Sequence, residues 1–364
     1  MKTMKSKFYS LALAAGMLSL TACSDDNTND SNNDKGNGIE NGSILKGTIT
    51  EDVTLKAGNT YKLSGEYIVE AGATLNIEEG VKIISVYDNI VDYILVKQGA
   101  KINAVGTPDK PIVMTSEKEE PGAWGGIHIC GKAHTNAEGG KGSSEIGGAV
   151  YGGNDDADNS GTLQYIRLEY TGFAFDEEHE ANGISFYGVG NGTIVDHCEA
   201  YKGSDDGFEF FGGSVNVSNM VVVSCSDDSF DWTEGWNGKG TDLVAYQEAK
   251  ATLGYDCDCL IEADNNENDN AATPVSHPVL KNLILAGNGE SKQGIRLRRG
   301  TQADIDNAKV CGKGQPLVVE SALTNASLKN GTSRLTNMTV TAALKSDGDY
   351  TNDDFTAVTS NKVD

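Results

Sequence analysis

The sequence predicts an all-β protein that folds as a right-handed parallel β-helix, and three observations support this prediction. Strand-like segments recur about every 22–24 residues. Gly is abundant, with 44 residues, whereas Pro is scarce, with 6, as many tight turns between strands require. Two of the repeats carry a pair of aspartates at the same position. A period of this length, built from short strands, is typical of a β-solenoid.

The aspartate pairs lie in residues 205–210 (DDGFEF) and 227–232 (DDSFDW). In a β-solenoid, equivalent residues of neighbouring coils lie one strand spacing apart, ~4.8 Å. We therefore expect the two pairs to stack carboxylate on carboxylate. This stack is the best candidate for a functional site that the sequence offers.

Two strand families define the expected coil, which has three short strands per turn. The first family has the pattern Gly-Φ-x-Φ, where Φ is apolar, and its copies begin at Gly126, Gly183, Gly207, Ser229, Leu260 and Gly294. The second has the pattern Φ-x-(Asn/Tyr/His)-Φ-x-Φ, and its copies span 163–168, 195–200, 217–222, 280–285 and 335–340. Asn219, Asn282 and Asn337 share its third position, which predicts an asparagine ladder at a turn.

The alternation of side chains along a strand assigns residues of the first family to two faces. The inward face is aromatic and predicts a core ladder of Phe208, Phe210, Phe230 and Trp232. The outward face predicts one column that contains His128, Ser185, Glu209, Asp231, Glu262 and Arg296. Tyr187 and Phe211 also point outward, so we regard them as candidates for stacking against sugar rings.

The expected domain organisation is a single β-helix over residues 44–364, closed at its start by residues 44–60. Two insertions interrupt the repeat: residues 131–160 are rich in Gly and Asp, and residues 264–276 are rich in Asn and Asp. The tail after residue 345 is expected to close the coil or fray. We expect no helix of convincing length after residue 22.

Residues 1–22 predict a lipoprotein signal peptide. Three lysines precede the apolar stretch Phe8–Leu20, which is too short to span a membrane. Residues 20–23 (LTAC) resemble the lipobox of bacterial lipoproteins, which implies cleavage before Cys23 and acylation of that residue. Several acyl chains would give stable anchoring. Residues 23–43 are then the lipidated cysteine and a disordered polar tether.

The charge and the remaining cysteines narrow the possible functions. The formal net charge of −24 makes nucleic acid an unsuitable partner and suits a cation binder or a solvated surface protein. Six cysteines follow Cys23, and the sequence cannot choose among their 15 possible pairings. These are Cys130, Cys198, Cys225, Cys257, Cys259 and Cys311.

The chain resembles a group of right-handed parallel β-helix lipoproteins from the outer membrane of Gram-negative bacteria. The lipobox, the turn at residues 69–75 (VEAGATL), the two aspartate segments and residues 261–265 (IEADN) carry the resemblance. It covers about residues 44–345. It implies an outer-membrane protein that is anchored by lipid and faces the cell exterior, but it implies no settled biochemical role.

The acidic column requires a physical explanation, because like charges at this spacing repel. A bound cation, raised pKa values, or splayed and solvated side chains would each relieve the repulsion. Calcium is the natural cation, since it accepts several carboxylates among its 6–8 oxygen ligands. The candidate metal ligands are Asp205, Asp206, Asp227, Asp228 and Asp264.

Catalysis and turn structure are the two other interpretations of the acidic residues. Carboxyl groups ~5–5.5 Å apart suit a retaining glycosidase, and wider pairs suit an inverting one. The catalytic candidates are Asp206, Asp228, Glu209 and Asp231. The chain lacks the Gly-His-Gly and Arg-x-Lys elements of pectin-degrading β-helix hydrolases. Asp-Asp-Gly is also favourable turn chemistry, so the aspartates can have a structural role alone.

We expect binding rather than catalysis, with an extended glycan as the ligand and calcium as a candidate cofactor. The candidate binding residues are Tyr187, Glu209, Phe211, Asp231, Glu262 and Arg296. Two alternatives stay open. One is a polysaccharide lyase or glycoside hydrolase that uses the stacked carboxylates. The other is a non-catalytic accessory lipoprotein of an outer-membrane transporter. The expected partners are thus the membrane, a polysaccharide and a transporter.

Overall fold

The computed structural model describes residues 38–88, 90–176 and 179–364. The predicted signal peptide, the lipidation site at Cys23 and most of the predicted tether lie outside the described residues. Within the described part of the chain, no helix has the length and apolar character needed to cross a membrane.

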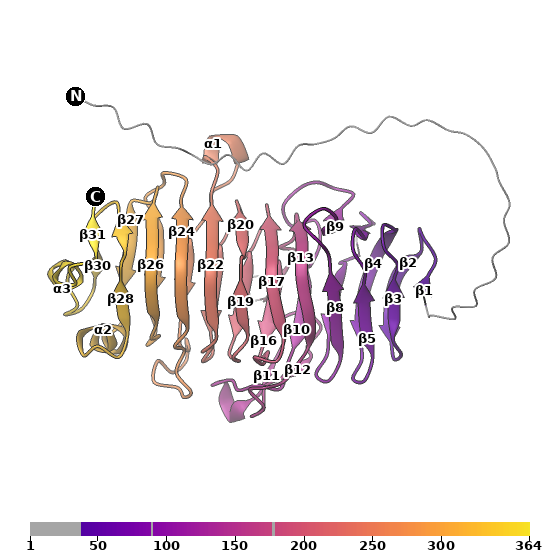
Figure 1. Cartoon of the computed structure of the whole chain (residues 1–364), viewed down its shortest axis with the longest axis horizontal. Helices are drawn as coiled ribbons and strands as arrows, with labels where there is room; N and C mark the ends of the chain where they lie inside the picture. Colours follow the sequence, from indigo (N-terminus) through magenta and orange to yellow (C-terminus); the bar gives the residue numbers. More distant parts are fainter. Residues whose placement is uncertain (1–37, 89, 177–178) are drawn as a thin grey trace. The chain divides into compact units, whose positions relative to one another are not determined.

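The described residues wind into a parallel β-helix, as predicted (Figure 1). In the described residues, 27 strands pair into one continuous sheet. Parallel pairing along the coil produces three ladders of strands. We call the ladder that contains the first strand family the site ladder. The other two meet at a corner and are called the first and second corner ladders.

The site ladder comprises strands from every part of the coil. Its members are β2 (Ile44–Ile49) and β4 (Thr60–Val69) through their second halves, then β7 (Tyr93–Val96), β10 (Ile127–Cys130), β16 (Ile184–Tyr187), β18 (Phe208–Phe211), β21 (Phe230–Thr233), β23 (Ile261–Ala263), β25 (Gln293–Leu297), β27 (Gln315–Val319) and β30 (Lys345–Ser346).

The first corner ladder starts the coil, because its first strand lies at Gly38–Ile39, earlier than residue 44. Its members are β1 (Gly38–Ile39), β3 (Val53–Leu55), β5 (Thr74–Ile77), β8 (Lys101–Val105), β13 (Gly161–Glu169), β17 (Ile194–Tyr201), β19 (Asn216–Ser218), β22 (Lys239–Tyr246), β24 (Val279–Ala286), β26 (Asp304–Cys311) and β28 (Arg334–Thr336).

The second corner ladder uses the first halves of β2 and β4 and the second halves of β13, β17, β22, β24 and β26. Its remaining members are β6 (Lys82–Ser85), β9 (Ile112–Ser116), β20 (Val221–Val223), β29 (Thr339–Val340) and β31 (Lys362–Val363).

The corner between these two ladders is the third position of the second strand family. Tyr165, His197, Asn219, Asp242, Asn282, Asn307 and Asn337 occupy it on successive coils, with φ between 52° and 61°. Asn tolerates this left-handed conformation better than most residues. The predicted asparagine ladder is therefore present, and His, Tyr and Asp extend it.

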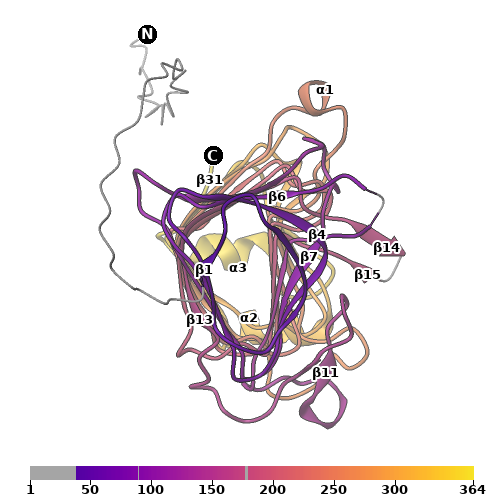
Figure 2. The ribbon, with the colours of Figure 1, turned by 90° about the vertical axis from the view of Figure 1, so that its right-hand side faces the viewer.

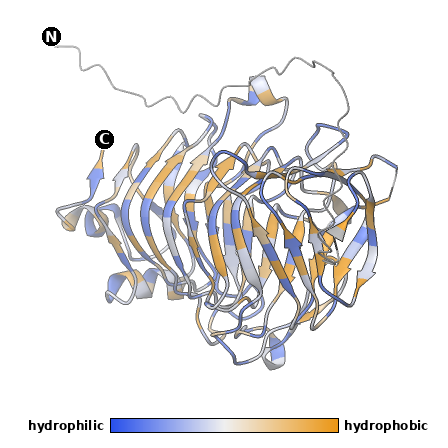
Figure 3. Cartoon of the chain, turned by 45° about the vertical axis from the view of Figure 1, so that its right-hand side comes forward, coloured by the Kyte–Doolittle hydropathy of each residue, from blue (hydrophilic) through white to orange (hydrophobic). Residues whose placement is uncertain are grey.

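The core follows the predicted alternation. Figure 3 shows hydrophobic and hydrophilic residues alternating along the strands. Inside the coil, the ring of Phe186 stacks on Phe210, and Phe210 stacks on Trp236 with ring centroids 4.1 Å apart. Such burial of large aromatic side chains provides much of the stability of each coil. Gly207 has its place here because a Cβ atom would lie 2.7 Å from the Ser229 carbonyl oxygen.

Short helices differ from the expectation that no helix of convincing length follows residue 22. The structure contains α1 (Lys250–Leu253), α2 (Ala322–Lys329), α3 (Asn352–Ala357) and a 3₁₀ turn at Glu138–Gly140. Figures 1 and 2 show α2 and α3 at the C-terminal end of the coil, across its cross-section. Phe355 of α3 is fully buried, so the tail closes the coil.

Two antiparallel hairpins lie outside the coil. One joins β11 (Gly142–Ser143) and β12 (Val150–Tyr151) within the insertion at residues 131–160. The other joins β14 (Ala174–Asp176) and β15 (His179–Glu180). The first hairpin lies beside the site ladder, so it bears on the candidate site.

Candidate functional site

The predicted acidic column is present on the outward face of the site ladder. The register pairs Ser185 with Glu209, Glu209 with Asp231, and Asp231 with Glu262. His128 precedes this series and Arg296 follows it. The local reason is the period-2 alternation of β18, β21 and β23, which turns every second residue away from the aromatic core.

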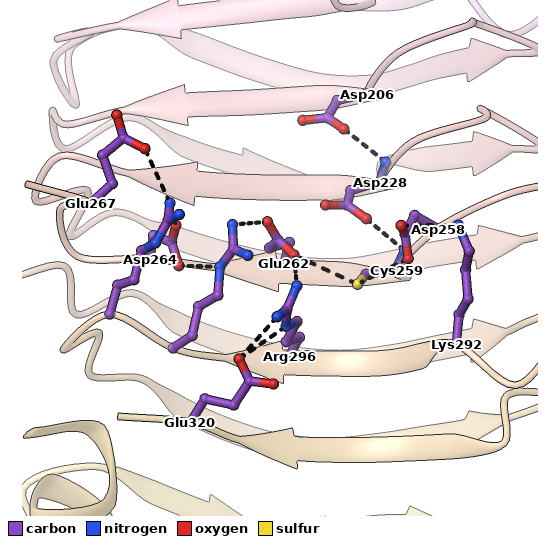
Figure 4. A network of polar contacts seen from close by, with 12 residues as sticks. Asp206, Asp228, Asp258, Cys259, Glu262, Asp264, Glu267, Lys292, Arg296 and Glu320 are labelled. Atoms are coloured by element: carbon purple, nitrogen blue, oxygen red, sulfur yellow. Dashed lines mark hydrogen bonds and ion pairs between the residues drawn. The ribbon is translucent and has the colours of Figure 1, made fainter. Parts of the chain in front are cut away.

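The aspartate pairs stack at the turn that precedes these strands (Figure 4). The Asp228 backbone N–H donates to Asp206 Oδ1 at 2.8 Å, and the Cys259 N–H donates to Asp228 Oδ1 at 2.5 Å. Both carboxyl groups are almost completely buried. Each one therefore binds the backbone of the next coil, which is the structural role that turn chemistry predicts.

The same carboxyl groups also gather into clusters that could hold a metal ion. Carboxylate oxygens of Asp206, Glu209 and Asp231 lie within 4.8 Å of one another. A second cluster of this kind joins Asp206, Asp227 and Asp228. A third brings together Glu180, Asp205 and Asp227. Four of the five aspartates predicted as metal ligands are thus brought together.

Burial and mutual repulsion make these groups hold protons strongly. Burial raises the pKa of Asp206, Glu209 and Asp231 well above the ordinary carboxyl range, and neighbouring carboxylates raise it further. Asp231 Oδ1 is buried and has no hydrogen-bond partner among the described residues. A buried oxygen without a partner is costly, so a proton or a cation at this point would be favoured.

The C-terminal end of the acidic column is neutralised by arginines (Figure 4). Arg296 lies 3.1 Å from Glu262, and Arg298 contacts both Glu262 and Asp264. Arg299 Nη1 lies 2.9 Å from the second carboxylate oxygen of Asp264. The guanidinium groups supply the positive charge here.

Asp264 is a correction to the predicted set of metal ligands. Its two carboxylate oxygens accept from Arg298 and Arg299, and it belongs to none of the possible metal clusters in the described ranges. Glu262 and Arg296 pair with each other, and Arg296 also binds Glu320. The predicted binding residues at this end are therefore already engaged within the protein.

Tyr187 and Phe211 are a second correction, because neither offers an open face to a sugar. Both point away from the coil interior as predicted, but the insertion at residues 131–160 covers them. The Tyr187 ring is fully buried, with its centroid 4.5 Å from Phe211 and 5.1 Å from Tyr151. The Tyr187 hydroxyl donates to Glu145 at 3.2 Å.

A pocket of about 300 Å³ lies over Glu209 and Asp231, and its lining is strongly acidic. The floor comes from the site ladder, and the walls come from the two insertions that the sequence indicates. The lining residues are Ser143, Glu145, Tyr151, Tyr187, Glu209, Phe211, Asp231, Thr233, Glu234, Asp264, Asn266, Glu267 and Asn268. Six of them are carboxylic acids.

Hydrogen bonds join the two insertions. Asn136 Nδ2 donates to Asn265 Oδ1 at 2.9 Å and to the Pro274 carbonyl at 3.0 Å. Asn266 Nδ2 returns a bond of 3.0 Å to Asn136 Oδ1. Sequence reasoning missed Glu145, Glu234 and Glu267 as site residues. The sequence did contain an indication that the insertions contribute to the site. Both insertions directly follow strands of the first family and so emerge at one edge of the coil.

A larger hollow of about 510 Å³ lies elsewhere, along the corner between the two corner ladders. Polar side chains in its lining bond to one another: Asn282 Nδ2 donates to the Asp242 carboxylate at 3.0 Å, and Asn307 Nδ2 donates to Asn282 Oδ1 at 2.8 Å. The acidic pocket is smaller, but it is lined by Glu209 and Asp231, whose pKa values are raised, and Asp231 has a buried oxygen without a hydrogen-bond partner among the described residues. We therefore take the acidic pocket as the candidate site.

The six described cysteines are free thiols, and five of them are buried. Cys259 Sγ lies close enough to Asp228 and Glu262 to form a further cluster that could hold a metal. Burial raises the pKa of Cys259 strongly, and Arg296 and Arg298 already neutralise Glu262. A buried thiol is therefore the better description of Cys259.

The arrangement supports two kinds of chemistry. Clustered carboxylate oxygens suit a hard divalent cation such as calcium. Adjacent carboxyl groups with raised pKa values also suit general acid catalysis near neutral pH. Both kinds of chemistry would use Glu209 and Asp231, at the floor of the pocket.

The comparison with protein families agrees with the fold. Residues 47–364 match a family described as "Pectate-lyase like beta helix domain". No curated protein matches the sequence. Among solved structures, the chain is similar to the A-module of mannuronan C-5 epimerase AlgE6 from Azotobacter vinelandii. The two share 13% sequence identity, 82% of each chain is covered, and the TM-score is 0.34. The family match includes the acidic pocket and both insertions.

Proposed function

The chain belongs to the family of pectate-lyase-like β-helix domains, and from this premise we propose that its acidic pocket binds a glycan together with a divalent cation. Calcium is the cation that the donor set favours, because all the available donors are carboxylate oxygens. The proposal keeps Glu209 and Asp231 as binding residues. It does not use Glu262, Asp264 or Arg296, which are paired with one another and with neighbouring charges.

The observation that carries the proposal is a cluster of three carboxyl groups without a cationic partner in the described part of the chain, two of which, Glu209 and Asp231, line the pocket. Asp206, Glu209 and Asp231 approach within 4.8 Å, and no arginine or lysine pairs with them among the described ion pairs. A calcium ion needs 6–8 oxygens, so three side chains would leave positions for water and for sugar hydroxyl or carboxylate oxygens. The ion would thus link the protein to its ligand.

Calorimetric titration of the purified protein tests the proposal. We expect calcium to bind, and a glycan from a panel of neutral and acidic polysaccharides to bind more tightly with calcium present. Glu209→Gln and Asp231→Asn should each weaken calcium binding at least ten-fold, since each removes one charged ligand. Asp109→Asn, an exposed acid far from the pocket in sequence, is the matched control. The absence of heat with calcium and with every glycan would exclude the proposal.

Catalysis is a second candidate, supported by the raised pKa values. Burial raises the pKa of Glu209 and of Asp231, so either group keeps its proton to a higher pH than an ordinary carboxyl group does, as a general acid requires. A lyase or glycoside hydrolase would release shorter chains from a polysaccharide. Assays for new chain ends on uronic-acid and neutral polymers would detect it. Glu209→Gln should abolish that activity, whereas glycan binding without cleavage would favour the first proposal.

We also propose that Cys23 anchors the protein by lipid in the outer membrane, facing the cell exterior. The lipobox at residues 20–23 and the polar segment after it support this placement. Metabolic labelling with an alkyne fatty acid should label the wild-type protein and leave Cys23→Ala unlabelled. Protease treatment of intact cells tests the outward orientation. An accessory role at a transporter remains an alternative, and co-purification from outer membranes would test it.

A further inference from the structure

The outward face of the site ladder is covered at one end and open beyond it. Leu95, His128 and Ser185 occupy the column on β7, β10 and β16, and all three side chains are fully buried. The next two members, Glu209 and Asp231, are partly exposed. The change occurs between two adjacent strands, β16 and β18. A groove that follows this column would therefore end at the level of Ser185.

The cover is a packed structure. Ile146, Ala149 and Tyr151 of the insertion form a second hydrophobic core, separate from the coil interior, against the outer face of the site ladder. Its other members on and beside the ladder are Tyr93, Leu95, Cys130, Ala181, Tyr187 and Phe211. Opening a core of this kind would return several large apolar side chains to water, which is unfavourable. The closed end is thus a fixed feature.

Glu234 holds the cover in position beside the pocket through hydrogen bonds. Its carboxylate accepts from the Tyr151 hydroxyl and from the Thr135 hydroxyl, both at 2.7 Å. The bonds from Asn136 to Asn265 and Pro274 then continue the wall into the second insertion. The pocket is therefore bounded by the buried end of the ladder and by a wall along one side.

The open part of the column is short. It runs over β18, β21, β23 and β25, which is three strand spacings, or ~14 Å. The guanidinium groups of Arg296 and Arg298 lie at its far end. A volume of about 300 Å³ is at the small end of the range for ligand pockets. This space suits a chain end better than the middle of a long polymer.

We propose that the pocket receives the terminus of a glycan chain, which enters from the Arg296 side and stops against the cover over Ser185. The proposal rests on the glycan-binding function and adds the part of the chain that is recognised. The terminal sugar would lie over Glu209 and Asp231. An internal segment that follows the ladder would be stopped at Ser185, because the polymer would have to continue through the second hydrophobic core.

Counting binding sites on one polymer at different chain lengths tests this inference. The probes are polygalacturonate, alginate and a neutral β-glucan, each as the long polymer and as size-fractionated oligomers, with calcium present. For the polymer that binds, we expect the number of protein molecules bound per gram of glycan to rise in proportion to the number of chain ends per gram. The affinity per mole of chain should stay constant. Borohydride reduction of the reducing ends then identifies which terminus is recognised.

A substitution in the pocket wall provides a second measurement. Ser143→Trp places a large ring in the pocket lining and should reduce oligomer binding at least ten-fold. Lys141→Trp, on the same insertion but outside the lining, is the control and should bind as the wild type does. Sites that scale with polymer mass and not with chain ends would overturn the inference while the glycan-binding function stands. The absence of binding to all three glycans in every form would overturn both.

Discussion

Asp228 is a residue that belongs to a turn and to an acidic cluster at once. Its Oδ1 accepts the buried N–H of Cys259, while its charge is close to Asp206 and Asp227. Burial and neighbouring carboxylates, Glu262 first among them, raise its pKa well above the ordinary range. The hydrogen bond and the charge can be separated by substitution, because asparagine keeps the acceptor and removes the charge.

We expect Asp228→Ala to lower the free energy of unfolding by about 1–3 kcal/mol, because the Cys259 N–H loses its partner. Asp228→Asn should cost less than half of this in calcium-free buffer, since it retains Oδ1 and relieves the repulsion. Urea denaturation followed by tryptophan fluorescence measures both. If Asn destabilises as much as Ala, the negative charge itself is needed and the turn role alone does not explain the residue.

Arg298 is central to the ion pairs that neutralise the C-terminal end of the acidic column. It contacts Glu262 and Asp264, and its own side chain is 18% exposed. We expect Arg298→Met to destabilise the protein by about 3 kcal/mol, because the largely buried carboxylates of Glu262 and Asp264 each lose one of their two guanidinium partners.

Arg334 provides the control for this prediction. It pairs with Asp304 at 2.8 Å, but its side chain is 69% exposed. Arg334→Met should therefore change stability far less than Arg298→Met does, because water and salt screen an exposed pair. Equal losses in the two variants, measured by chemical denaturation, would show that the Arg298 network is no more important than a surface pair.

At the scale of elements, the corner between the two corner ladders depends on one backbone conformation. Asn282 has a φ of 60° and bonds to Asp242 and Asn307. Asn282→Val places a β-branched side chain in the left-handed region, so we expect a loss of about 1–3 kcal/mol. Asn282→Gly relieves that strain and should cost less than Val. A Val variant as stable as wild type in urea would show that the corner tolerates any residue.

The strands and their register could be predicted from the sequence because both patterns are local. The Gly-Φ-x-Φ strands align Glu209, Asp231 and Glu262 through a fixed repeat length, and stacking turns that spacing into a column. The left-handed corner is visible as the third position of the second family. These features depend on alternation and on turn chemistry, which neighbouring residues determine.

The state of the site residues could not be predicted in the same way. Tyr187 points outward as expected, yet its exposure depends on Ile146 and Tyr151 in an insertion without periodicity. Asp264 has the chemistry of a metal ligand, but Arg298 and Arg299 reach it from the next coil. Both outcomes follow from packing between segments that are distant in sequence, which alternation does not encode.

At the scale of the whole molecule, coils contact only their neighbours, so stability is close to a sum over adjacent pairs. The acidic column is an unfavourable contribution to that sum on several successive pairs, in a chain with a formal net charge of −24. The aromatic core offsets it, as in the contact of Phe210 with Trp236. The balance between the two contributions must change with pH, because the carboxyl groups of the column titrate and the aromatic side chains of the core do not.

We expect the calcium-free protein to lose stability as the pH rises above about 4, where these carboxyl groups ionise in the unfolded chain. Asp206, Glu209, Asp228 and Asp231 have raised pKa values in the folded protein, whereas in the unfolded chain they titrate near pH 4. Above pH 4 the folded state therefore binds more protons than the unfolded state, and the free energy of unfolding falls with increasing pH. Calcium would replace those protons and make the stability depend less on pH.

Thermal unfolding in the presence of a chelator, and then of calcium, measures both effects. Glu209→Gln/Asp231→Asn removes two of the groups and should reduce the slope, whereas a calcium-free stability that increases towards pH 8 would contradict the repulsion on which the cation site depends.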